Sequence, residues 1–361
     1  YPLRRQRQMC IRDRLYIANN NSSDTRIYKE LKSLNEEFYI SYLGINSSSK
    51  NADSFFGKKY CKNFFLINGK AKNPLTLLKF VLKAYYIILK FNINSLHIVN
   101  EQIFFLIYPI SFFKRCVLDQ FDSIFYNRLN FLRRIPFFLY FFYKPLKKII
   151  VTDLNRKFLM PSYYHDKILI LPNYPIYRQT VMKKEKTNNL SILYFGWLGK
   201  SRGSELISGL LNLNKGLRIF SAGWIGDNYT KILFEKYDKV INYSGVLNQY
   251  EALKLSQKVD YIICVYEPNS INNINASPNK IYDAIQIQTP VIINSEVKIS
   301  KFVDKINLGY IIKDYYKINY ENLYNDLVKN RLSYQIDNDL RKKYCWEAID
   351  HNLLSLSLIH I

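Results

Sequence analysis

The sequence has few cysteines and histidines, and neither residue type is clustered. Its 361 residues include five cysteines and four histidines, and no two cysteines form a C-x-x-C pair. This spacing fits neither a disulfide framework nor a structural zinc site. We therefore expect a protein of a reducing compartment that holds no metal.

Long apolar runs are also missing. No stretch reaches the roughly 18–20 apolar residues that a membrane-spanning helix needs, and no secretory signal is visible. These two absences predict a cytoplasmic protein. Residues 1–14 and 355–361 resemble translated sequencing-adapter read-through, so we treat both segments as non-native and exclude them from the fold prediction.

Acidic residues are scarce relative to basic ones, and the formal net charge is +23. Lys is enriched together with Asn, Ile, Tyr and Phe, which is typical of AT-rich codon usage, so the charge has two interpretations. Either it reflects coding bias, or it attracts anionic partners such as phosphorylated sugars, acidic lipids or nucleic acid. A nucleic-acid-binding protein would need a concentrated basic stripe or a recognisable module. Neither is present, so we expect no nucleic-acid partner.

The first half of the chain alternates short apolar runs with helical patterns. Asp24 is placed to cap the first helix, whose apolar face contains Ile27, Leu31 and Leu34. Strands that alternate with helices predict a parallel sheet covered on both faces. The expected strands are 15–18, 38–44, 95–99, 114–119, 147–153 and 167–173.

A second α/β series follows a break in the pattern. Residues 174–190 contain proline, polar residues and a charge run, and we interpret them as a linker. The expected strands beyond it are 191–195, 217–223, 239–245, 260–266 and 290–294. We predict one domain over 15–173, a second over 191–335, and a terminal helix over 336–354 that returns to the first domain.

The strongest local motif is YFGWLGKSRGSELI at residues 194–207, a strand, a glycine-containing loop and a helix. Glycines allow a ligand to approach the backbone, and the start of a helix offers free N–H groups. Lys200 and Arg202 add positive charges that suit a diphosphate. The alternative is an ordinary glycine-rich turn with solvated basic side chains.

A second motif is ASPNKIYDAIQIQTPVII at residues 276–293. Ser277 can cap a helix that has Pro278 at its first position. Lys280 and Asp283 are three residues apart and therefore share one face near the start of that helix. The pair could hold a phosphate and a ribose, or it could be a simple surface ion pair.

The order of these segments resembles family-4-type GT-B glycosyltransferases over nearly all of residues 15–354. GWLGKSRG, SAGW, NYSGVL and the second motif resemble the C-terminal domain, and NNNSSDTRIYKELKSL resembles the first βα unit. The resemblance implies an α/β fold of the GT-B type, two Rossmann-like domains with parallel sheets facing across a cleft. It places the acceptor in the N-terminal domain and the nucleotide-sugar in the C-terminal one.

The same resemblance assigns roles to single residues. The donor diphosphate would contact Gly196, Gly199, Lys200, Arg202 and Lys280. The ribose would contact Asp283, with Ser277, Pro278 and Asn279 supporting the site. Three positions depart from the family pattern: Trp197 replaces an arginine, Asn275 replaces the first of two paired acids, and residues 119–122 lack the histidine of an Asp-x-His-Glu stretch.

The first domain offers only weak candidates for acceptor activation. Asp122 and Glu101 both follow strand ends there and could act as the catalytic base. Arg26, at the start of the first helix, could contact a phosphate of donor or acceptor, whereas His97 fits a buried core position. The aromatic and basic segment 129–150 could lie at a membrane interface, or it could pack beside the sheet.

The resemblance implies sugar transfer from a nucleotide-sugar to a saccharide or lipid-linked acceptor, in cell-surface polysaccharide or lipopolysaccharide synthesis. It further implies retention of anomeric configuration, no metal, and no cofactor besides the nucleotide-sugar co-substrate. We expect peripheral contact with an anionic membrane at the inner face of the cytoplasmic membrane. The alternative is a non-catalytic scaffold or partner subunit of the same fold, because one acid and one histidine of the family pattern are missing.

Overall fold

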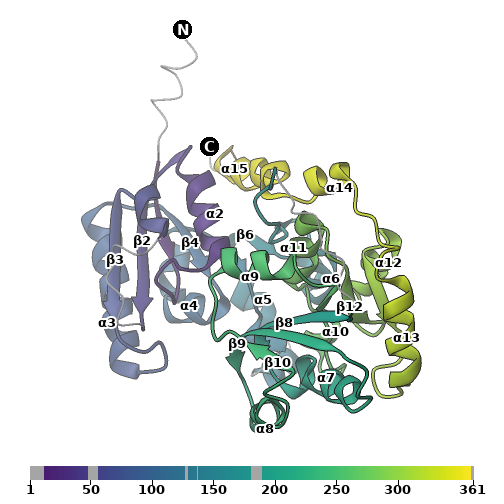
Figure 1. Cartoon of the computed structure of the whole chain (residues 1–361). Coiled ribbons are helices and arrows are strands. Elements are labelled where there is room, and N and C mark those ends of the chain that lie inside the picture. Colours follow the sequence, from purple (N-terminus) through teal and green to yellow (C-terminus); the bar gives the residue numbers. More distant parts are fainter. Residues whose placement is uncertain (1–11, 48–55, 127–128, 136, 180–188, 359–361) are drawn as a thin grey trace. The chain divides into compact units, whose positions relative to one another are not determined.

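A computed structural model of the chain describes residues 12–47, 56–126, 129–135, 137–179 and 189–358 (Figure 1). The chain forms two compact units, one of residues 1–172 with 349–361 and the other of residues 173–348. Most of the expected linker, residues 180–188, lies outside the described part. Within the described residues, no helix combines the length and apolar character needed to cross a bilayer.

The first unit contains a seven-stranded sheet in the order β3-β2-β1-β4-β5-β6-β7. All of its strand pairs are parallel, as the alternation of strands and helices predicts. The strands are β1 (Arg12–Ile17), β2 (Phe38–Asn46), β3 (Asn63–Asn68), β4 (Ser95–Val99), β5 (Arg115–Gln120), β6 (Leu146–Val151) and β7 (Ile168–Ile170).

Two strands of this sheet differ from the sequence-based expectation. β1 begins at Arg12, three residues before Leu15, so part of the excluded start pairs with β2. β3 was not expected at all. It is an edge strand whose first five side chains are all half-buried, so its sequence, NFFLIN, lacks the alternating pattern of a strand with one buried face.

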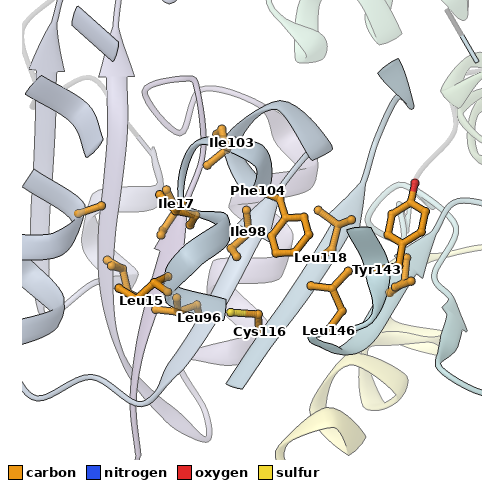
Figure 2. Close-up of a cluster of buried hydrophobic side chains, with 14 of the residues drawn as sticks. Leu15, Ile17, Leu96, Ile98, Ile103, Phe104, Cys116, Leu118, Tyr143 and Leu146 are labelled. Carbon is orange, nitrogen blue, oxygen red and sulfur yellow. The ribbon is translucent and has the colours of Figure 1, made fainter. Parts of the chain in front are cut away.

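The helices of the first unit pack against this sheet around a large apolar core. Those that lie between its strands are α2 (Thr25–Leu34), α3 (Pro74–Lys90), α4 (Glu101–Leu106), α5 (Phe138–Tyr143) and α6 (Leu154–Leu159). Asp24 caps α2 through the amides of Arg26 and Ile27, which confirms that prediction. Figure 2 shows Phe104 of α4 lying over the strands that carry Ile98 and Leu118.

The end of the chain forms two helices where one was expected. α14 (Asn338–Lys343) belongs to the second unit, and α15 (Asp350–Leu358) belongs to the first, where it packs against α2. Between them the amide of Trp346 donates to the carbonyl of Pro175 at 2.8 Å, which interrupts the helical hydrogen bonding. The helix α15 also continues to Leu358, past the expected end at 354.

The second unit contains a six-stranded parallel sheet in the order β10-β9-β8-β11-β12-β13. Its strands are β8 (Ser191–Leu198), β9 (Arg218–Ile225), β10 (Ile241–Tyr243), β11 (Tyr261–Ile263), β12 (Val291–Asn294) and β13 (Gly309–Ile312). Its longer helices are α7 (Ser204–Leu211), α8 (Asn228–Lys236), α9 (Gln249–Ser256), α11 (Asn279–Ile287) and α13 (Tyr320–Asn330). Ile192 and Tyr194 of β8 enter one apolar cluster and Leu193 enters another, so both faces of the sheet are buried.

Candidate functional site

Two glycines, Gly196 near the end of β8 and Gly203 just before α7, have a backbone conformation that only glycine adopts readily. Gly196 has φ +96° and Gly203 has φ +125°. A Cβ at Gly203 would also lie only 2.6 Å from the side chain of Ile263. The backbone conformation at these two glycines therefore determines how the chain leaves β8 and enters α7.

The hydroxyl of Tyr194 forms three hydrogen bonds that hold the loop between β8 and α7 in place. It donates to the carbonyl oxygen of Gly199 at 3.0 Å and accepts from the amide of Gly199 at 2.6 Å and from the Ser204 hydroxyl at 3.1 Å. Asp227 adds a second support, because its Oδ2 accepts from the amide of Lys200 at 2.6 Å. Neither residue belonged to the predicted site, since nothing in the local sequence shows what a buried tyrosine or a helix cap supports.

Lys280, in the first turn of α11, carries a positive charge that no acidic side chain of the described residues pairs with. It is half-buried, its Nζ donates to the carbonyl oxygen of Ile263 at 3.3 Å, and it lies 5.0 Å from the ring centroid of Phe195. Among the described residues no carboxylate forms an ion pair with it. Burial lowers the pKa of Lys280 to about 8. A Cβ at Gly196 would be 3.6 Å from the Lys280 Cε, an ordinary van der Waals contact, so the two residues are close neighbours.

Arg202 supplies a second cation next to Lys280. Its guanidinium carbon lies 4.1 Å from the ring centroid of Tyr266, and no ion pair involves it within the described part of the chain. The positive charge of Arg202 contributes to the lowered pKa of Lys280, after burial. Two partly desolvated cations without a counter-charge form a site that favours an anion.

The start of α11 adds backbone N–H groups to this site. The helix begins at Asn279 with Pro278 as its N-cap residue, and no side chain caps it. The predicted cap by Ser277 is therefore wrong by one position, because Pro278 has the extended backbone of the N-cap (ψ 127°). An uncapped helix start leaves its first N–H groups available to an anion.

Two other predicted donor-site residues, Lys200 and Asp283, are already paired or buried. Lys200 Nζ lies 3.8 Å from Glu205 Oε1, so this lysine has a carboxylate partner that Lys280 lacks. Asp283 is buried in α11, three residues after Lys280. Asn275, at the position of the missing acid, is also buried, and its Oδ1 has no hydrogen-bond partner among the described residues.

Arg26 lies in a buried ion cluster of the first unit. Its Nε is 2.8 Å from Glu30 Oε1, and its Nη2 is 2.8 Å from Asp119 Oδ1. Its Nη1 donates to the carbonyl of Leu171 at 3.1 Å. All three charged side chains are at most 2% exposed. The guanidinium therefore has structural partners in place of the free donors that the predicted phosphate contact needs.

His97 completes this cluster. It is fully buried as predicted, and its ring stacks on Tyr16 with 4.4 Å between centroids. Its Nε2 is 3.3 Å from Glu30 Oε2, but at an angle that makes no hydrogen bond. Burial raises the pKa of Asp119 to about 7. For Glu30, burial alone would raise the pKa. The opposing effects of Arg26 and then His97 are larger together, so the pKa of Glu30 lies below its usual range. Glu30, His97 and Asp119 are close enough to hold a metal ion, although Arg26 already forms an ion pair with each of the two acids.

The two candidate bases have very different surroundings. Glu101 is 0% exposed and accepts hydrogen bonds from the Ser123 hydroxyl at 2.9 Å, the Ile124 amide at 2.8 Å and the Tyr143 hydroxyl. Its oxygens thus join α4 to the loop after β5, and burial raises its pKa. Asp122, in contrast, has a side chain that is 78% exposed, and its Oδ1 lies 3.6 Å from Arg156 Nη2.

Comparisons with known proteins show the fold of this chain. No protein-family model and no curated protein sequence matches it. Solved structures do match: sucrose-phosphate synthase from Thermosynechococcus elongatus has a TM-score of 0.67 at 13% identity, over 96% of this chain and 98% of that one. Anabaena HepE, solved with UDP and glucose, has a TM-score of 0.68 at 11% identity, over 96% and 99%. The lipopolysaccharide outer core galactosyltransferase WaaB has a TM-score of 0.63 at 10% identity, also over 96% and 99%.

These likenesses and the two parallel sheets show that the chain has a GT-B-type fold of two Rossmann-like units. The predicted fold class is therefore confirmed.

Proposed function

We propose that this protein is a glycosyltransferase that takes a sugar from a nucleotide-sugar donor. The observation that carries the proposal is Lys280, a half-buried cation at the start of α11, next to Arg202. Among the described residues no carboxylate pairs with Lys280 and no side chain caps α11. A donor diphosphate is the anion that fits it, because two cations and helix N–H groups match its charge and its several acceptor oxygens.

The structural neighbours support this assignment of ligand class. HepE was solved in complex with UDP and glucose, and WaaB is a galactosyltransferase of lipopolysaccharide. The proposal extends nucleotide-sugar binding to this chain because the same fold carries an unpaired cationic site at the carboxyl ends of β8 and β11. Parallel α/β sheets bind ligands at that edge.

The chemistry of transfer follows from the charge of the leaving group. The bond between the anomeric carbon and the diphosphate breaks, and an acceptor hydroxyl oxygen bonds to that carbon as its proton is lost. Lys280, Arg202 and the start of α11 stabilise the negative charge that develops on the diphosphate, without a metal. In this proposal Asp283 holds the ribose, and Gly196, Gly199 and Asn279 let the donor approach the backbone.

The acceptor is assigned to the first unit. We place a saccharide or lipid-linked acceptor there, in cell-surface polysaccharide or lipopolysaccharide synthesis, with retained anomeric configuration and contact with an anionic membrane. Asp122 is the candidate base, because it is an exposed carboxylate at the end of β5. Glu101 is a weaker candidate, because its oxygens hold the surrounding loops together.

The deciding experiment is a calorimetric screen of the protein against UDP, GDP, ADP and CMP and their sugar conjugates. We expect saturable binding of one nucleotide, strongly weakened by Arg202→Ala and by Asp283→Ala. Lys301→Ala, an exposed lysine of the same unit, is the matched control and should bind normally. A folded protein that binds none of these nucleotides would contradict the proposal, and binding without sugar transfer would favour a non-catalytic scaffold.

A further inference from the structure

The outer side of α3 exposes a continuous apolar stripe. The inner side of this helix buries Phe80, Ala84 and Ile87 in the core of the first unit. The exposed residues are Leu75 (68%), Leu78 (56%), Leu82 (61%), Tyr86 (48%) and Leu89 (78%). Their spacing of three or four residues places them along one side of the helix. Single exposed apolar residues are normal on a protein surface, but a contiguous stripe marks an interaction site.

The stripe lies in a part of the chain that is almost free of acidic residues. Residues 54–152 contain 16 Lys and Arg but only three acids. Two of these acids, Glu101 and Asp119, are 0% exposed, so Asp122 is the only one left at the surface. Lys79, Lys83 and Lys90 follow one edge of the stripe, and the ammonium groups of Lys83 and Lys90 lie 4.8 and 5.4 Å from the ring centroid of Tyr86.

Exposed aromatic residues extend this surface beyond the end of α3. Lys114 Nζ donates to Asn94 Oδ1 at 2.9 Å, and the amide of Arg115 donates to the carbonyl of Asn94. These bonds bring the segment before β5 next to the turn that follows α3. Phe112 and Phe113, in that segment, are 61% and 84% exposed. We call Leu75, Leu78, Leu82, Tyr86, Leu89, Phe112 and Phe113, with the lysines around them, the α3 surface.

We propose that the α3 surface docks the protein on an anionic lipid bilayer. Leucine and phenylalanine side chains enter the boundary between headgroups and acyl chains, and lysines bind lipid phosphates at the same depth. A second copy of this chain fits less well, because it would bring two basic, acid-free surfaces together. This inference names the surface for the membrane contact in the proposed function, but it does not require that sugar transfer occurs.

The test is flotation with phosphatidylcholine vesicles prepared with and without phosphatidylglycerol, in the absence of nucleotide and sugar. We expect the protein to float only with the anionic vesicles, and less in high salt because screening weakens the lysine contacts. The double variant Leu78→Glu/Leu82→Glu should lower the partition constant at least about tenfold, through lost apolar insertion and added repulsion. Both side chains are exposed, so the fold should tolerate the change.

Leu332→Glu is the matched control. Leu332 is 62% exposed, like Leu82, but belongs to the second unit. This variant should float like the unmodified protein, and all three proteins should bind nucleotide equally in the calorimetric screen. Equal flotation of the double variant, or no flotation of the unmodified protein, would overturn the inference. Self-association that is lost only in the double variant would also overturn it and assign the α3 surface to a second copy. Lipid binding without nucleotide binding would refute the proposed function alone.

Discussion

The ammonium of Lys280 and the carbonyl oxygen of Ile263 lie 3.3 Å apart, at the point where β11 ends and α11 begins. This hydrogen bond directs a cation over the carboxyl edge of the sheet while leaving its charge uncompensated by any carboxylate of the described residues. A half-buried lysine without a counter-charge among the described residues costs stability, so its presence suits a site that binds an anion.

Lys280→Met should weaken nucleoside diphosphate binding about 10- to 100-fold, because one charge-assisted contact is lost. Its free energy of unfolding should not fall, since methionine fills the same apolar surroundings without a buried charge. Isothermal calorimetry and urea denaturation measure the two quantities. Lys280→Arg keeps the charge and should retain part of the affinity. Unchanged affinity in Lys280→Met would remove this residue from the site.

The lowered pKa of Lys280 predicts two pH effects of opposite direction. Its pKa is about 8 in the folded protein, against 10.5 ordinarily. Between these values the unfolded chain binds more protons, so the contribution of Lys280 to stability rises with pH in this window. Diphosphate affinity should instead fall as pH rises above 8, because the site loses its positive charge. Lys280→Met lacks this titration but keeps the other groups that titrate in the same range. Both pH effects of Lys280 are therefore measured as the difference between the unmodified protein and this variant.

Tyr194→Phe should loosen the glycine-containing loop. The hydroxyl makes three hydrogen bonds, two with Gly199 and one with Ser204, so we expect a loss of about 1–3 kcal/mol in stability and weaker nucleotide binding. Tyr261→Phe is the control, because that hydroxyl donates to the carbonyl of Leu327 and not to the glycine-containing loop. It should cost some stability but leave nucleotide affinity unchanged. Equal affinities in the two variants would show that the loop does not depend on Tyr194.

Two buried arginines should respond to substitution in opposite ways. Arg14 is 0% exposed, its Nη1 and Nη2 have no hydrogen-bond partner among the described residues, and burial lowers its pKa to about 9. Arg14→Met should therefore stabilise the protein, by about 1–3 kcal/mol. Arg26→Met should destabilise it by about 3–5 kcal/mol, because Glu30 and Asp119 would remain buried without their cation. Urea denaturation decides both, and a loss of stability in Arg14→Met would contradict the first expectation.

The two candidate bases can be separated by comparing rate with stability. Asp122→Asn should lower kcat for sugar transfer and leave the melting temperature unchanged, because the side chain is exposed. Glu101→Gln should lower stability by about 1–3 kcal/mol, since an amide cannot accept all the hydrogen bonds that the carboxylate receives. An unaltered kcat in Asp122→Asn would show that Asp122 is not the catalytic base.

The class of fold could be predicted from sequence because it depends on local patterns. Runs such as SLHIV match β4 at both ends, and the cap at Asp24 forms as expected. The edge strand β3 was missed because its half-buried side chains carry no periodic signal. Ser277 was taken for the cap of α11 because a serine before a proline is a good local start, although the backbone places the cap one residue later.

The sequence by itself determined that strands and helices alternate, that glycines and cations gather after β8 and at α11, and that acids are scarce around α3. Only the tertiary structure decided which of these charges have partners. Arg26 meets Asp119 across 93 residues of chain, whereas Arg202 and Lys280 meet aromatic rings and a carbonyl oxygen. Charge pairing depends on contacts between distant segments, and local periodicity carries no information about those contacts.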